Sequence, residues 1–320
     1  MPITPDDKLP PTVAAALDKQ EKVKPTDAFE SMLQKIASPD GQYIPWEKVQ
    51  LPSKGQYYDG RIPDGWVEVK PFSIDVDKMT SNQRLVASGE LLNKIVECCV
   101  RFPDDTFSVY DMLAGDQHYL LYYLRGITHG PEYEFVVNCP FCETKSIYEY
   151  DLGNLQKTLK TPNPEFPVEP MAVKLPQLSK LQNQEVMALV RLVRVKDIAA
   201  MTKISNNVDV HDPINKAKAR SKSDKKDAKP KADSDKAYLD GMKLQITGIR
   251  IDGVDFNDTR RNILIEKMHQ RDTSTIRSFI DSISPGIDTN LEVTCQNSEC
   301  GKEYAVPLPF GENFFRSTKA

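Results

Sequence analysis

Two cysteine pairs organise the predicted structure of this chain: Cys139-Pro140-Phe141-Cys142 and its counterpart Cys295-Gln296-Asn297-Ser298-Glu299-Cys300. A short apolar segment runs into each cysteine pair, and a segment of alternating polarity follows it, so each pair is predicted to lie at the tip of a β-hairpin. Two cysteines separated by two to four residues can direct both sulfurs at one ion, and two such knuckles complete the tetrahedral four-thiolate shell of structural zinc. The sequence therefore predicts a split zinc ribbon with Cys139, Cys142, Cys295 and Cys300 as the ligands.

The predicted zinc is structural, because four thiolates leave no open position for a catalytic water. It joins segments far apart in the sequence, so metal binding contributes to folding. The alternatives are reduced surface thiols or a redox pair. A thioredoxin-like pair would lie between a strand and a helix, whereas Ser146 to Leu152 continues as a strand. Cys98 and Cys99 follow Ile95 and Val96 at helical spacing and are expected to pack in the core.

Composition limits the classes of protein. The 320 residues are 39% hydrophobic and 28% charged, which favours one or two modest cores with solvated segments. The net charge of -4 argues against a dedicated nucleic-acid binder. No apolar run approaches the about 20 residues that span a bilayer, and Met1 to Pro11 does not have the pattern of a secretory signal. We therefore expect no membrane contact and folding in a reducing cytoplasm, where close cysteine pairs favour metal over disulfides.

Outward from the knuckles, the sequence predicts an α+β protein made of small mixed domains that the zinc ribbon joins. Its parts are expected at 1–45 (an extended N-terminal arm), 46–160 (an α+β domain with the first knuckle), 161–205 (an extended segment and a helix over Asn183 to Thr202), 206–238 (a disordered Lys/Asp-rich loop) and 239–320 (a helical segment and the second knuckle). The loop carries no aromatic residue and too little apolar surface to offset the entropy of ordering it.

The N-terminal arm contains one candidate partner-binding segment. Phe29, Met32, Leu33 and Ile36 recur at the spacing of one helical face, in a segment with too little apolar content to fold alone. This stripe is predicted to dock on a neighbouring protein. A terminal tail without a role is the alternative.

Nothing in the sequence indicates catalysis. The four histidines, at positions 118, 129, 211 and 269, have no neighbouring nucleophile in a recognisable motif, and no Gly-rich phosphate loop is present. Asp104, Asp105 and Asp116 are interpreted as turn and N-cap residues rather than acid or base groups. We expect no catalytic residue and no small-molecule substrate.

An ordered set of motifs spans residues 48 to 316. It consists of Leu51-Pro52-Ser53-Lys54-Gly55 with Tyr57-Tyr58, Gly115-Asp116 before a helix, Leu124-Arg125-Gly126, His129-Gly130-Pro131-Glu132-Tyr133, Cys139-Pro140-Phe141-Cys142, Val173-Lys174-Leu175-Pro176 and Phe310-Gly311-Glu312-Asn313-Phe314-Phe315. In this set the chain resembles the baseplate protein family of T-even-like contractile-tailed bacteriophages. The resemblance implies a structural or assembly protein of the baseplate hub, with other tail proteins as partners, present in the host cytoplasm during assembly and then in the virion tail. The chain departs from the family in the wider spacing of its second cysteine pair, its long arm and its Lys/Asp-rich loop.

The main alternative is a zinc-ribbon regulatory protein that binds nucleic acid. Such a protein needs basic and aromatic residues around its knuckles. Here the neighbours are mostly acidic or neutral: Asn138, Glu143, Glu292, Glu299 and Glu303, with only Lys145 and Lys302 basic. A thiol or metal enzyme is a third possibility, but the sequence offers neither a base with an orienting partner nor an open metal position.

Overall fold

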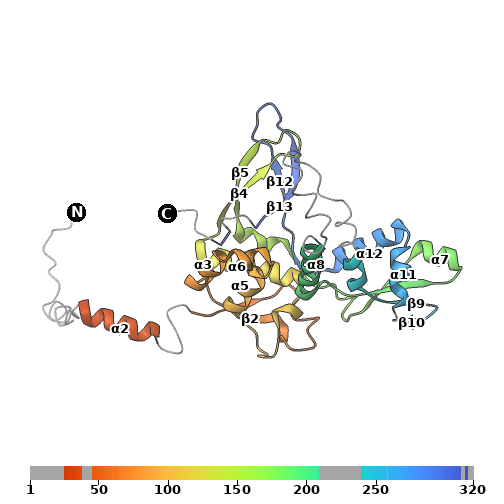
Figure 1. Cartoon of the computed structure of the whole chain (residues 1–320), viewed down its shortest axis with the longest axis horizontal. Coiled ribbons are helices and arrows are strands. Elements are labelled where there is room, and N and C mark those ends of the chain that lie inside the picture. The colour runs from red at the N-terminus through yellow and green to blue at the C-terminus, as the bar shows by residue number, and fades with distance from the viewer. Residues whose placement is uncertain (1–24, 38–44, 209–238, 258, 311–313, 316–320) are drawn as a thin grey trace, which may run out of the picture. The chain divides into compact units, whose positions relative to one another are not determined.

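The computed structural model describes residues 25–37, 45–208, 239–257, 259–310 and 314–315. The chain divides at Pro45 into two units. Helix α2 (Pro25–Ala37) belongs to the first unit, and its proline occupies the first helical position, where no amide hydrogen is needed. All other described elements belong to the second unit and mix helices with antiparallel sheets (Figure 1). The predicted α+β class is confirmed.

The second unit begins with a three-stranded antiparallel sheet and a group of helices. The strands pair in the order β1–β2–β3, and the alternation of the second strand buries Val67 and Val69. Helix α5 buries Ile95, Val96 and Cys99. Of the two cysteines expected in the core, Cys99 is fully buried and Cys98 is partly buried against the same core. The elements are β1 (Glu47–Gln50), η1 (Pro63–Gly65), β2 (Trp66–Val69), α3 (Ile74–Thr80), α4 (Gln83–Ala87), α5 (Leu91–Cys99), β3 (Val100–Arg101) and η2 (Val109–Asp111).

Helix α6 (Ala114–His129) is the central helix of this region, and it is buried on most of its circumference. Its first turn packs so closely against the chain at Pro285 that a Cβ on Gly115 would lie 2.0 Å from the Pro285 carbonyl oxygen. Any side chain at Gly115 would therefore separate α6 from this loop. The helix ends at Gly130, whose φ of 89° is a conformation that glycine adopts without strain.

The second unit also contains two β-hairpins that are far apart in the sequence. Strands β4 (Glu132–Asn138) and β5 (Lys145–Asp151) form the first, and β12 (Asn290–Thr294) and β13 (Glu303–Pro307) form the second. The hairpins lie beside each other (Figure 1), and the Tyr148 hydroxyl donates a hydrogen bond of 2.8 Å to the Thr294 carbonyl. Both cysteine pairs thus lie at hairpin tips, where the sequence predicted them.

The rest of the unit is a four-stranded antiparallel sheet with helices around it, in the strand order β10–β9–β8–β7. Strand β8 lies inside this sheet and is almost entirely buried, which suits its apolar run. The elements are η3 (Leu152–Thr158), β6 (Leu159–Lys160), β7 (Met171–Lys174), α7 (Pro176–Gln182), β8 (Val186–Val190), α8 (Val195–Val208), β9 (Ile246–Ile251), β10 (Val254–Phe256), α11 (Arg260–Glu266), α12 (Gln270–Ile283) and β11 (Gly286–Ile287), the last paired with β6.

The predicted helix over Asn183 to Thr202 is wrong in its first half. Val186–Val190 is strand β8, and the helix begins only at Val195. Apolar residues at 186, 189, 190 and 193 satisfy helical spacing, but a short continuous apolar run fits a buried strand equally well. The predicted loop at 206–238 lies outside the described residues, except for 206–208, which end α8.

Asp116 joins the turn at Leu51 to Gly55 with helix α6. Its Oδ1 accepts a hydrogen bond of 3.0 Å from the Ser53 amide, and its Oδ2 accepts one of 2.5 Å from the Tyr58 hydroxyl. That hydroxyl in turn accepts a hydrogen bond from the Leu113 amide. Asp116 is fully buried in the first turn of α6, so its interpretation as an N-cap is wrong; the N-cap is Leu113.

Burial gives Asp116 a testable pH dependence. It raises the pKa of this carboxyl to about 6, although hydrogen bonds from Ser53 and Tyr58 oppose the shift. Because the folded-state pKa lies above the unfolded value, the folded state binds the proton more tightly, and the contribution of Asp116 to stability increases as the pH falls through 6. Between pH 7.5 and pH 5, the free energy of unfolding should rise by about 1.4 kcal/mol relative to Asp116→Asn, which cannot titrate.

Urea unfolding of both proteins at the two pH values measures this difference, and pH effects elsewhere cancel between them. Equal pH dependence of the two proteins would show that Asp116 is already ionised in the fold at pH 5.

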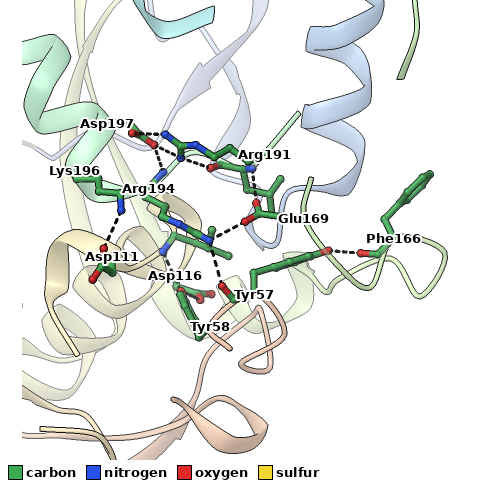
Figure 2. A network of polar contacts seen from close by, with 12 residues as sticks. Tyr57, Tyr58, Asp111, Asp116, Phe166, Glu169, Arg191, Arg194, Lys196 and Asp197 are labelled. Atoms are coloured by element: carbon green, nitrogen blue, oxygen red, sulfur yellow. Dashed lines mark hydrogen bonds and ion pairs between the residues drawn. The ribbon is translucent and has the colours of Figure 1, made fainter. Parts of the chain in front are cut away.

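A network of polar contacts joins the turn at Tyr57 to the residues that follow strand β8 of the four-stranded sheet (Figure 2). The Glu169 carboxylate accepts hydrogen bonds from the Leu192 amide (2.5 Å) and from the Arg194 guanidinium (2.7 Å). The same guanidinium donates to the Tyr57 carbonyl. Arg191 forms a two-point ion pair with Asp197, at 2.7 and 2.8 Å. The four charged side chains of these two ion pairs are largely buried. Removing one member of a pair would therefore leave the other charge buried without a counter-charge.

Candidate metal centre

The sulfurs of Cys139, Cys142, Cys295 and Cys300 converge at the tips of the two hairpins. All four Sγ atoms lie within 4.8 Å of one another. The Cys139 and Cys300 sulfurs are 3.9 Å apart, and those of Cys142 and Cys295 are 3.6 Å apart. In the part of the chain that the structure describes, this is the one group of three or more potential metal ligands.

The first knuckle is a tight turn that closes β4 on β5. The Cys139 amide donates to the Thr144 carbonyl (3.0 Å), and the Glu143 amide donates to the Cys139 carbonyl (2.9 Å). Glu143 takes a φ of 57° to complete this turn. Both cysteine side chains consequently leave the turn toward the second hairpin.

The second knuckle is longer by two residues, and side chains of its loop hold the first hairpin. Gln296 donates a hydrogen bond of 2.6 Å to the Ile147 carbonyl. Asn297 donates to the Thr144 hydroxyl (3.3 Å) and approaches the Cys142 sulfur (3.9 Å). Side chains of this longer loop thus bridge the two hairpins. These contacts could not be predicted from sequence because they join residues about 150 positions apart.

The surroundings of the sulfurs differ. The hydroxyl and backbone amide of Thr144 hydrogen-bond to Cys142 and lower the pKa of its thiol to about 6. The Asn297 amide lowers the pKa of Cys295, but burial and the neighbouring sulfurs raise it, with a net value of about 12. Four thiolates side by side repel one another, and this repulsion is relieved when a cation lies among them.

The donor set fits a zinc ion. Four sulfurs in tetrahedral positions at the usual zinc–sulfur distance of about 2.3 Å lie about 3.8 Å apart. The separations of 3.6 and 3.9 Å fall on either side of that value. Cys139 and Cys295 are buried, while Cys142 and Cys300 are partly exposed, so an ion could enter from the tip. Four thiolates would fill the coordination shell of zinc, which is the pattern of structural sites.

The bases of both hairpins rest on helix α6. From α6, the Tyr122 hydroxyl donates to the Leu308 carbonyl after β13 (2.6 Å), and the Arg125 guanidinium donates to the Glu132 carbonyl at the start of β4 (3.4 Å). The Tyr133 hydroxyl of β4 donates to the Pro309 carbonyl (2.9 Å) and so joins the two hairpin bases. The Phe314 ring packs edge-on against both tyrosines, at centroid distances of 5.3 Å. The hairpins are therefore fixed to α6 at one end, and the cysteines meet at the other.

The other predicted site residues lie away from this centre. Phe29, Met32 and Leu33 are exposed on α2 by 56%, 48% and 47%, and Ile36 belongs to the same helix. Among the described residues, no helix combines the length and apolar character that crossing a membrane requires.

Comparison with known proteins places the chain in a family. The family model described as T4 bacteriophage base plate protein matches residues 48–316. Neither a curated protein nor a solved structure is significantly similar to the chain. The matched range contains both cysteine pairs, the Asp116 junction and the aromatic cluster at the hairpin bases. The chain therefore belongs to the T4 bacteriophage base plate protein family, which indicates a structural role in the phage baseplate.

Proposed function

We propose that this protein is a structural or assembly component of the hub region of a contractile tail baseplate, braced by one structural zinc. The observation that carries the proposal is the convergence of four cysteine sulfurs from two hairpins whose bases both rest on α6. Zinc at this position would lock the two hairpins into one projecting element. Such an element can present fixed surfaces to neighbouring subunits, which is what a structural protein requires.

Catalysis is not part of the proposal. The four cysteines would use every position of a tetrahedral zinc ion, so substrate or water has no place to bind the metal. The family is structural, and the baseplate location implies contacts with other tail proteins.

Nucleic-acid binding is the weaker alternative. The exposed side chains around the knuckles include Glu143, Glu299 and Glu303, which repel phosphates. The nearby Lys302 ammonium lies 4.4 Å from the centre of the Phe141 ring, so this lysine and this aromatic ring already form a cation–π contact with each other. No described feature near the knuckles favours a nucleic-acid partner.

We further propose that helix α2 binds a neighbouring tail subunit through Phe29, Met32, Leu33 and Ile36. An isolated helix of 13 residues is marginal in water, and three large apolar side chains on one face remain exposed. Docking in an apolar groove would bury them and stabilise the helix.

Phe29→Asp with Leu33→Asp tests this role of the arm. Two charges in an apolar contact should reduce incorporation into baseplates at least about tenfold, because each desolvated charge costs several kcal/mol. The thermal midpoint should not change. Ser31→Asp with Gln34→Asp adds the same charge to exposed polar positions of the same helix and should incorporate normally.

Incorporation is measured by quantifying the variant in purified baseplates beside the wild type. Normal incorporation of the Phe29/Leu33 variant would make the arm a passive tail. A parallel loss of thermal stability would instead mean that the arm packs on its own chain.

A further inference from the structure

The outer face of the first hairpin exposes apolar side chains that no described residue of the chain covers. Val136 on β4 and Ile147 on β5 lie directly opposite each other and are 58% and 62% exposed. The alternating residues Phe135 and Val137 point to the buried side instead. Two large β-branched side chains therefore form a paired apolar patch on a face of the sheet that points away from the core.

Acidic residues adjoin this patch toward the base of the hairpin. Glu134 and Glu149 lie directly opposite each other and are both exposed. Each is two residues along its strand from Val136 or Ile147, on the same face. Like charges in this arrangement destabilise a hairpin. Among the described residues, neither carboxylate forms a salt bridge with a Lys or Arg side chain.

The second hairpin shows that the hairpin architecture does not require this surface. Val136 precedes Cys139 by three residues, as Glu292 precedes Cys295. The cross-strand partner of Glu292 is Ala305, so the corresponding pair exposes no large apolar side chain. The apolar and acidic pairs are thus specific to the first hairpin.

We propose that this outer face, defined by Glu134, Val136, Ile147 and Glu149, binds an extended basic segment of another baseplate protein. An aliphatic side chain of that segment packs on Val136 and Ile147, and a lysine or arginine two positions away pairs with Glu134 and Glu149. The spacing follows from the strand geometry, because residues two positions apart are separated by about 6.6 Å in both chains. A basic partner is favoured because its charge removes the repulsion between the two glutamates.

This proposal rests on the proposed baseplate function, and cross-linking in assembled baseplates can separate the two. A photoreactive amino acid at position 136 should cross-link to a peptide of another baseplate protein that carries Lys or Arg two residues from an aliphatic residue. The same amino acid at position 305 is the matched control on the second hairpin and should not capture that peptide. Mass spectrometry identifies the captured peptide.

Charge reversal provides a second test. Glu134→Lys with Glu149→Lys keeps two like charges opposite each other, so the hairpin itself should be equally stable, while incorporation into baseplates should fall about tenfold or more. The control Glu292→Lys with Glu303→Lys makes the same charge change on the second hairpin and should incorporate normally.

The outcomes have separate meanings. A protein that is absent from baseplates even in its wild-type form would refute the proposed function. Incorporation without a cross-link from position 136, a cross-link to this chain or to a second copy, or capture of a segment without basic residues would overturn only the docking proposal.

Discussion

Cys295→Ser should abolish metal binding and cause the largest loss of stability of any single substitution in the chain. The serine hydroxyl does not replace a thiolate as a zinc ligand, and the three remaining sulfurs leave the shell incomplete. Structural zinc contributes about 10–16 kcal/mol of apparent binding free energy in small zinc domains, and most of that becomes folding energy. The site also closes the long loop between Cys142 and Cys295, which are 153 residues apart and whose hairpins are also joined by hydrogen bonds such as those of Tyr148 and Gln296.

Metal analysis and thermal unfolding of the purified variant measure these effects. The wild type should contain one zinc per chain, and the variant should contain essentially none and melt at a clearly lower temperature. Cys98→Ser is the matched control, since Cys98 is partly exposed and lies outside the sulfur cluster. A Cys295→Ser variant with unchanged zinc content and melting temperature would refute the metal centre.

Glu169→Ala should lower the free energy of unfolding by about 3–5 kcal/mol. The substitution removes a carboxylate that accepts hydrogen bonds from Leu192 and Arg194, and the Arg194 side chain is only 16% exposed. The guanidinium would then be largely buried without its ionic partner, which costs more than the ion pair contributes when it is complete. Urea unfolding at neutral pH measures the loss.

Two further variants separate this mechanism from a general effect of losing a glutamate. Glu165→Ala, at an exposed position in the same loop, should change stability by less than about 0.5 kcal/mol. Glu169→Ala with Arg194→Ala should cost less than the sum of the two single variants, because it removes the uncompensated charge. Additive losses would show that the two side chains contribute independently.

The features that could be predicted from sequence are those that short segments determine. Alternating polarity around each cysteine pair identified the strands of both hairpins, and cysteine spacing identified the four residues whose sulfurs converge. The helical spacing of Cys98 and Cys99 after Ile95 and Val96 likewise indicated a helix, now α5, whose cysteines pack against the core. In each case local pattern and tertiary environment agree.

The features that could not be predicted depend on contacts between distant segments. The apolar spacing of the β8 segment is compatible with a helix, but the segment forms a strand because β7 and β9 pair with it on both sides. Asp116 has the sequence context of a capping residue, but in the fold its carboxylate accepts hydrogen bonds from Ser53 and Tyr58, which are distant in the sequence. The roles of Gln296 and Asn297 depend on the first hairpin lying beside the second knuckle.

The zinc and protein contents of assembled baseplates show whether this chain is a zinc-braced component of the baseplate. Baseplates are purified from infected cells, this chain is quantified by mass spectrometry, and zinc is measured in the same fractions. The comparison is with baseplates from an infection that supplies only Cys295→Ser. We predict that the wild-type chain is present with one zinc per copy, and that Cys295→Ser lowers both incorporation of the chain and the zinc associated with it. Baseplates that lack the chain, or that contain it without zinc, would contradict the account.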